Sequence, residues 1–285
     1  MRDEPSQNPA VVVGIDGSRT ALSAALWAVE EAVSRDVPLR LLYAIEPPGE
    51  PADPTTAARA LANADVALRE IFVVVESMGT PVRIEAEIVQ DRPEHALRAA
   101  SRAAVLLCLG ALGLGHAGGR RIGSVAATVA RDAHCPVAIV RRHDPVRRGA
   151  GWVIAEVDES PDGDAVLACA LREARLRRAP LRVLGIRRPD GDDDHGARGG
   201  CVLVRTHLDK RLARWRRAYP DVAVEAVAVS GSTTDYVARE AETIQLAVVG
   251  QARATGLADI TGPAAHAALH DTACSVLICS RHGAL

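Results

Sequence analysis

Short apolar runs alternate with longer segments of helical periodicity along the whole chain. In the first half, runs rich in Val, Ile and Leu are bounded by Gly or Pro, and they predict strands at 10–15, 38–45, 82–89, 104–109 and 136–141. The segments between them have apolar residues at helical spacing, and they predict helices at about 20–36, 55–78, 92–103 and 124–133. Strands that alternate with helices favour a parallel sheet with right-handed crossovers and helices on both faces.

The second half of the chain repeats this order, with strands predicted near 152–157, 180–186, 222–229, 245–250 and 275–280. The apolar run that ends in Asp16 returns with Asp158, and the segments 105–110 and 133–137 return as 246–250 and 272–276. This self-similarity indicates a tandem duplication, with domains at 1–146 and 147–285 joined by a linker near 143–151. Inside the second domain, the acidic and Gly-rich segment 189–200 is predicted to be a mobile loop.

Composition excludes several classes of protein. The hydrophobic content of 48% in 285 residues is enough to bury the cores of two domains. The formal charge is only −2 and aromatic residues make up 2%, which disfavours a nucleic-acid-binding protein because both basic charge and stacking groups are scarce. No apolar run reaches the roughly 18 residues of a membrane span, and the polar segment 1–10 lacks a signal region. We therefore expect a cytoplasmic protein without a membrane partner.

Lysine and cysteine usage narrows the chemistry further. Lys210 is the only lysine and no Gly-Lys pair exists, so a Walker-type phosphate loop is excluded. The six cysteines form no CxxC pair, which argues against a zinc site or a redox dithiol, and we expect buried, reduced thiols.

The segment 110–124 is rich in glycine and follows the fourth predicted strand. Its small side chains let backbone N–H groups approach a ligand closely and surround an anion. Gly123 and Ser124 then begin a predicted helix, whose free N–H groups and positive dipole end favour phosphate. In an open parallel sheet, ligands bind beyond the carboxyl ends of the strands where the chain order reverses. The segment therefore predicts a nucleotide site that uses no lysine.

The spacing within this segment is that of a known family. Gly110 and Gly113, followed after nine residues by the pair 123–124, resemble the nucleotide motif of the ATP-binding universal stress proteins. The run 13–18 resembles the N-terminal strand of that family, and 134–137 its approach to the last strand. Both halves are covered, so the chain is similar to the tandem-domain members. The resemblance implies two α/β domains of Rossmann-like fold, each with five parallel strands in the order 3-2-1-4-5, with ATP across strands 1 and 4.

The resemblance also implies which residues contact ATP. It assigns Asp16 to the adenosine moiety, Ala44 to adenine, Gly110 and Gly113 to the ribose and phosphates, and Gly123, Ser124 and Val125 to the β- and γ-phosphates. Gly14 and Gly115 complete the predicted binding set. Any Mg²⁺ would be held mainly by phosphates and water, with help from Asp16 or the Ser124 hydroxyl.

The second half departs from the motif. Asp158 is retained, but Glu159 stands in place of Gly17, Arg253 replaces the second glycine of the loop, and Pro263 replaces the glycine before the helix. Proline supplies no N–H at a helix start and no hydroxyl. We therefore expect ATP only in the first domain.

Other interpretations of these motifs remain open. Residues 113–118 spell GxGxxG, but a dinucleotide fingerprint should follow the first strand, and this copy follows the fourth. Asp16 and Ser124 could each be a helix cap. His266 and His270 have the i, i+4 spacing of a metal pair but no third ligand nearby in the sequence, so no metal site is predicted.

One further segment, 210–217, is strongly basic and contains Trp215. A solvated helix face with one anchored aromatic residue explains it, and a docking surface for protein or RNA is the alternative. The family pairs its domains through their last strands, here 137–140 and 276–278, and the resemblance implies that two chains associate again as a homo-oligomer.

For function, the resemblance implies an ATP-binding regulator of stress or dormancy that senses adenine nucleotide and acts through an unidentified protein partner. A slow ATPase or nucleotide hydrolase is the enzymatic alternative, and a nucleotide-free interaction scaffold is the third. Near the glycine-rich segment, only His116, Arg120 and Arg121 could assist hydrolysis, and arginine cannot serve as a base. No catalytic residue is therefore predicted, and retention of bound ATP is favoured over turnover.

Overall fold

The computed structural model describes residues 8–47, 54–112, 123–141, 151–158, 162–187, 196–230, 232–240, 242–251 and 274–279. The chain divides into two compact units, Met1–His143 and Asp144–Ala284, each with its own core. No helix in the described part of the chain combines the length and hydropathy that a membrane span requires.

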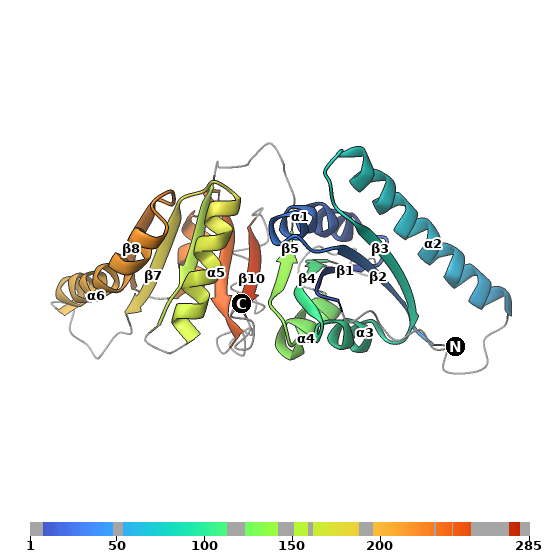
Figure 1. Ribbon diagram of the computed structural model, residues 1–285. Coiled ribbons are helices and arrows are strands. Elements are labelled where there is room, and N and C mark those ends of the chain that lie inside the picture. The colour runs from blue at the N-terminus through green and yellow to red at the C-terminus, as the bar shows by residue number, and fades with distance from the viewer. Residues whose placement is uncertain are drawn as a thin grey trace. The chain divides into compact units, whose positions relative to one another are not determined.

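Unit 1 is a five-stranded parallel sheet covered by helices on both faces (Figure 1). Its elements in chain order are β1 (Ala10–Ile15), α1 (Arg19–Arg35), β2 (Leu39–Ile45), α2 (Pro54–Ser77), β3 (Ile84–Gln90), α3 (Pro93–Ala100), β4 (Ala104–Gly110), α4 (Ser124–Asp132) and β5 (Val137–Val140). The strand order is β3-β2-β1-β4-β5, which confirms the predicted order. Helices α1 and α2 contact each other on one face, and α3 and α4 contact each other on the other face.

Unit 2 repeats this architecture. Its elements are β6 (Trp152–Glu156), α5 (Asp162–Leu176), β7 (Leu181–Arg187), α6 (Gly196–Ala218), β8 (Val224–Ser230), α7 (Thr233–Glu240), β9 (Ile244–Gly250) and β10 (Ser275–Cys279). The strand order β8-β7-β6-β9-β10 is that of unit 1, again with all pairings parallel. The two Rossmann-like domains predicted from the sequence are therefore confirmed.

The central strands form the core because both of their faces are covered. In β1, Val11, Val12 and Val13 are fully buried, and in β4 the same holds for Leu107 and Cys108. Continuous β-branched and aliphatic runs of this kind are typical of parallel strands packed between two helix layers. Five of the six cysteines are buried, as predicted, whereas Cys201 is half-buried. Burial raises the pKa of Cys135 to about 12.

One sequence-based prediction is wrong in part. Residues 196–200, which the sequence assigned to a mobile loop, lie in the first turns of α6. Glycine disfavours a helix by itself, but extending an existing helix fixes one residue for each hydrogen bond gained, so the packed remainder of α6 supports these turns. The rest of the predicted loop, 189–195, lies outside the described residues.

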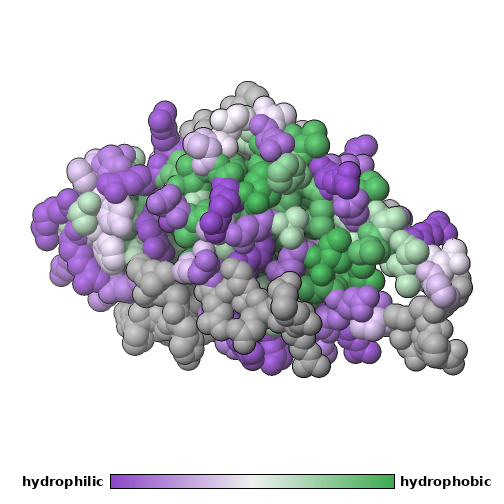
Figure 2. Space-filling model, turned by 45° about the vertical axis from the view of Figure 1, so that its right-hand side comes forward, coloured by the Kyte–Doolittle hydropathy of each residue, from purple (hydrophilic) through white to green (hydrophobic). Residues whose placement is uncertain are grey.

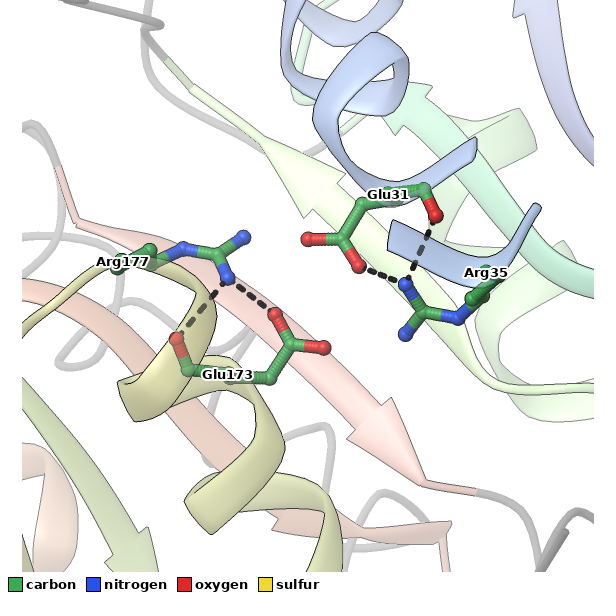
Figure 3. A network of polar contacts seen from close by, with 4 residues as sticks. All are labelled: Glu31, Arg35, Glu173 and Arg177. Carbon is green, nitrogen blue, oxygen red and sulfur yellow. Dashed lines mark hydrogen bonds and ion pairs between the residues drawn. The ribbon is translucent and has the colours of Figure 1, made fainter. Parts of the chain in front are cut away.

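The duplication extends to a buried ion pair within the first helix of each unit (Figure 3). In α1, an Arg35 guanidinium nitrogen donates to the Glu31 carboxylate and to the Glu31 carbonyl, the latter at 3.2 Å. In α5, Arg177 makes the same two bonds to Glu173, with 3.3 Å to the carbonyl. Both glutamates are fully buried, and in each unit the arginine offsets part of the charge of the buried carboxylate.

The helix after the second strand differs between the units. Figure 2 brings the α2 side of unit 1 forward and shows hydrophobic residues at the surface; on α2 itself the exposed ones are Leu61, Val66, Phe72 and Val73. Helix α6 also exposes Val202 and Leu203, but it carries in addition the basic segment predicted from the sequence. Its arginines are partly compensated, because Asp164 binds Arg211 and Arg214.

Candidate functional site

A cavity of about 520 Å³ opens at the carboxyl ends of β1, β2 and β4 in unit 1, which is within the range typical of small-molecule sites. Strand β1 pairs with β2 on one side and β4 on the other, so the cavity lies where the chain order of the sheet reverses. Seven of the nine predicted ATP-binding residues line it, namely Gly14, Asp16, Ala44, Gly110, Gly123, Ser124 and Val125. The other two, Gly113 and Gly115, lie outside the described residues.

The turn after β1 is shaped by two polar side chains. The Asp16 carboxylate accepts a hydrogen bond of 2.9 Å from the Ser18 backbone N–H, and Gly17 between them has a positive φ of 81°. Ser18 is the N-cap of α1, since its hydroxyl accepts from the Ala21 N–H at 3.1 Å. The alternative that Asp16 caps this helix is therefore wrong. Asp16 instead holds the turn at the cavity wall.

The turns after β1 and β4 are joined through one backbone carbonyl. The Thr20 hydroxyl donates to the carbonyl of Leu112, and the Ser18 hydroxyl lies 3.4 Å from the same oxygen. Gly110 permits this approach, because a Cβ at that position would lie 2.7 Å from the Thr20 carbonyl carbon and 2.8 Å from the Ala21 nitrogen. The absent side chain therefore lets the two turns meet at the edge of the cavity.

The start of α4 forms the opposite wall. The Gly123 N–H donates to the Ala111 carbonyl at 2.9 Å, so the glycine-rich segment begins and ends beside β4. Gly123 is the N-cap and makes no side-chain capping bond, and the first turn holds no acidic residue. Because the first N–H groups of a helix lack internal partners, this wall offers donors and a positive dipole end to an anion.

Sequence reasoning missed part of the lining. Tyr43 and Glu46 lie on either side of Ala44 in the sequence. Pro93 is the first residue of α3, and Leu97 lies one turn later in the same helix. Tyr43 and Glu46 are signalled by their adjacency to Ala44 at the end of the second strand. The residues of α3 carry no sequence signal, because only the fold brings that helix beside β1. Asp16 and Glu46 are the charged groups among the lining residues, so phosphate charge would be met by backbone N–H groups.

Comparisons with known proteins agree with this geometry. A model of the universal stress protein family matches twice, at residues 8–141 and 153–280. The chain belongs to the universal stress protein family. Universal stress protein Rv2028c of Mycobacterium tuberculosis is 45% identical over 276 residues, which cover 95% of each chain. The crystal structure of a universal stress protein from Archaeoglobus fulgidus covers 96% of this chain and 97% of its own at a TM-score of 0.69, with 18% identity, and so shares the fold.

In the second universal stress protein domain, an arginine of α6 contacts the backbone just after β6. The Asp158 carbonyl accepts a hydrogen bond from Arg211 of α6, and the same guanidinium binds the Asp164 carboxylate at 2.8 Å. A Cβ at Gly163 would lie 2.6 Å from the Asp158 carbonyl oxygen. The turn after β6 is therefore held by an arginine of the domain itself. Arg253 and Pro263, which alter the motif, lie outside the described residues.

Among the described residues, no group of three or more His, Cys, Asp or Glu side chains is arranged to hold a metal ion. His134 packs in unit 1, where its backbone N–H donates to the Ser101 hydroxyl at 3.0 Å. The pair His266 and His270 lies outside the described ranges.

The Asp164 contacts predict a pH dependence of stability. Burial would raise the pKa of Asp164, but hydrogen bonds from Arg211 and Arg214 outweigh burial and hold it below 3.8. A carboxyl group whose pKa is lowered by folding stabilises the fold at pH values above its unfolded-state pKa. This stabilisation is lost as the pH falls through its folded-state pKa. Asp164→Asn should thus lower the free energy of unfolding at pH 7 by about 0.5–1 kcal/mol, because the pair is largely exposed. Urea unfolding should show this difference shrinking below about pH 4, and an equal difference at pH 7 and pH 3 would contradict the assignment.

Proposed function

We propose that this chain is an ATP-binding regulator of the stress or dormancy response, which retains nucleotide in its first domain and acts through a protein partner in the cytoplasm. One observation carries the proposal. Asp16 after β1 and the open N-terminus of α4 at Gly123 and Ser124 line the same cavity, although more than one hundred residues separate them in the sequence. The cavity thus offers a carboxylate acceptor for ribose hydroxyls and helix N–H donors for phosphates.

The lining favours binding over turnover. Phosphoryl transfer to water needs a base or a group that orients the attacking water near the terminal phosphate. Among the described lining residues, the cavity holds neither histidine nor lysine, and its two carboxylates come from the turn after β1 and the end of β2. We therefore expect nucleotide retention. ATP hydrolysis faster than about 1 per second, the low end of ordinary enzymes, would favour the hydrolase alternative instead.

The decisive experiment begins with the nucleotide that copurifies with the chain. Mass analysis after denaturation should find adenine nucleotide, and calorimetric titration of stripped protein should give one ATP per chain. Asp16→Ala should weaken ATP binding at least about tenfold, equivalent to roughly 1.4 kcal/mol, because it removes an acceptor for the ribose and loosens the turn at Ser18.

Asp158→Ala is the matched control, since Asp158 ends the equivalent strand of the second domain, and it should leave the affinity unchanged. Two ATP per chain, or loss of binding in Asp158→Ala alone, would contradict the assignment to the first domain. Protein that neither carries nor binds any adenine nucleotide, with cAMP tested beside ATP, would favour the scaffold alternative.

A further inference from the structure

Gly14 contributes only backbone atoms to the wall of the cavity in unit 1, because glycine has no side chain. A Cβ placed there would lie 2.7 Å from a methyl carbon of Leu109 and 3.1 Å from one of Leu97. Pro93, the first residue of α3, lines the cavity beside them. Gly14, Pro93, Leu97 and Leu109 are called the floor residues below. The floor is apolar, and no side chain at residue 14 enters it.

Strand registers identify the counterpart of each floor residue in unit 2. Gly14 of β1 pairs with Leu42 of β2, and in unit 2 Glu156 of β6 pairs with Leu184 of β7. Gly14 follows Val13 and Glu156 follows the equivalent Ala155, so Glu156 corresponds to Gly14. The strands on the other side give the next match. Val13 pairs with Cys108 of β4, and Ala155 pairs with Val248 of β9, so Cys108 corresponds to Val248. Leu109 therefore corresponds to Val249.

The helices α3 and α7 supply the other two matches. Each has eight residues and each follows the third strand of its unit, one beginning at Pro93 and the other at Thr233. Leu97 stands in the same place in its helix as Val237. The floor of unit 2 is therefore Glu156, Thr233, Val237 and Val249.

All four floor residues differ between the units, and the differences compensate one another. Glycine becomes glutamate, and the Glu156 carboxylate accepts a hydrogen bond of 2.7 Å from the hydroxyl of Thr233. The residue in that place in unit 1 is proline, which has no donor. Both leucines that press on Gly14 become valine, and Val237 and Val249 are buried. The smaller side chains leave room for the glutamate, so unit 2 replaces an open apolar floor with a hydrogen-bonded carboxylate.

We propose that the Glu156 side chain, held in place by Thr233, closes the second domain to adenine nucleotide, so that the chain carries one nucleotide rather than two. The proposal rests on the proposed function of the first domain. A carboxylate at the floor occupies volume that the ligand needs, and it places a negative charge near a triphosphate. Removing the bond partner alone would not reopen the site, because the glutamate side chain would remain. The proposal therefore attributes the loss of the nucleotide site in unit 2 both to the floor residues at the carboxyl end of the sheet and to the altered loop.

The experiment moves the unit 2 floor into unit 1. The variant Gly14→Glu with Pro93→Thr, Leu97→Val and Leu109→Val should fold with a melting temperature close to that of the wild type, and its affinity for ATP should fall at least about a hundredfold. The matched control carries the same three changes but keeps Gly14, so any effect of those three side chains is common to both variants, and it should bind ATP at least about twentyfold more tightly than the four-residue variant. A further variant with Gln at position 14 separates charge from volume, and its binding should also be strongly reduced.

Each outcome has one meaning. ATP binding by the four-residue variant at wild-type affinity would overturn the proposal. Failure of that variant to fold, while the control folds, would show that the four positions are not an interchangeable set, and would overturn it as well. Loss of binding in the control would assign the effect to the leucines and not to Glu156. A wild-type chain without any nucleotide affinity would instead defeat the proposed function, on which this inference rests.

Discussion

Replacing Arg177 with Met is expected to lower the free energy of unfolding by about 3–5 kcal/mol, because it removes the arginine that compensates a buried carboxylate. Glu173 is only 1% exposed, and Arg177 donates both to its carboxylate and to its backbone carbonyl. A carboxylate buried to this extent is costly once a cationic partner is removed. Urea unfolding followed by tryptophan fluorescence should show the loss, since Trp152 and Trp215 both lie in unit 2.

Arg175→Met provides a control on the same helix. Arg175 binds Asp221 at 2.6 Å with both side chains about half exposed, so solvent screens the pair and its removal should cost far less than the removal of Arg177. Equal losses in the two variants would mean that helix propensity or net charge, and not the buried carboxylate, sets the stability of this region.

Gly110→Ala should destabilise unit 1 by about 3 kcal/mol and weaken ATP binding, because the added methyl group collides with fixed backbone. Its Cβ would lie 2.7 Å from the carbonyl carbon of Thr20 and 2.8 Å from the nitrogen of Ala21. Relief requires α1 to move away from β4, which separates the hydroxyls of Ser18 and Thr20 from the Leu112 carbonyl. Thermal unfolding and calorimetric titration measure the two effects.

The corresponding glycine of unit 2 gives the control for this change. Gly250 ends β9 as Gly110 ends β4, but among the described residues a Cβ there would meet only a methyl carbon of Val166, at 3.3 Å. Gly250→Ala should therefore change the free energy of unfolding by less than about 1 kcal/mol. A large loss in both variants would indicate a general need for glycine at the strand end, and not a specific close approach to α1.

The fold was predictable because its determinants are local and repeated. Runs such as 10–15 and 104–110 are buried on both faces, so their composition alone marks them as central parallel strands. Their recurrence in the second half gave the tandem organisation. The start of α6 was not predictable, because glycine-rich turns form a helix there only with the support of the packed residues that follow.

The candidate site was predictable only where the chain itself carries a motif. Asp16 and the pair Gly123 and Ser124 stand at characteristic positions after strands, and the cavity includes them. Leu97 was not identifiable, since its place beside Gly14 depends on how α3 packs against the sheet. The same holds for Thr233, whose bond to Glu156 joins residues that are distant in the sequence.

Among the features that both units retain is an ion pair across the outer strands. Arg40 binds Glu85 at 3.2 Å between β2 and β3, and Arg182 binds Glu225 at 2.9 Å between β7 and β8. Each pair joins the second strand of its unit to the edge strand, so both halves fix the edge of the sheet in the same way, whereas all four floor residues differ between them. Under the proposal made for the second domain, the framework of a half and its capacity for nucleotide are therefore set by different side chains.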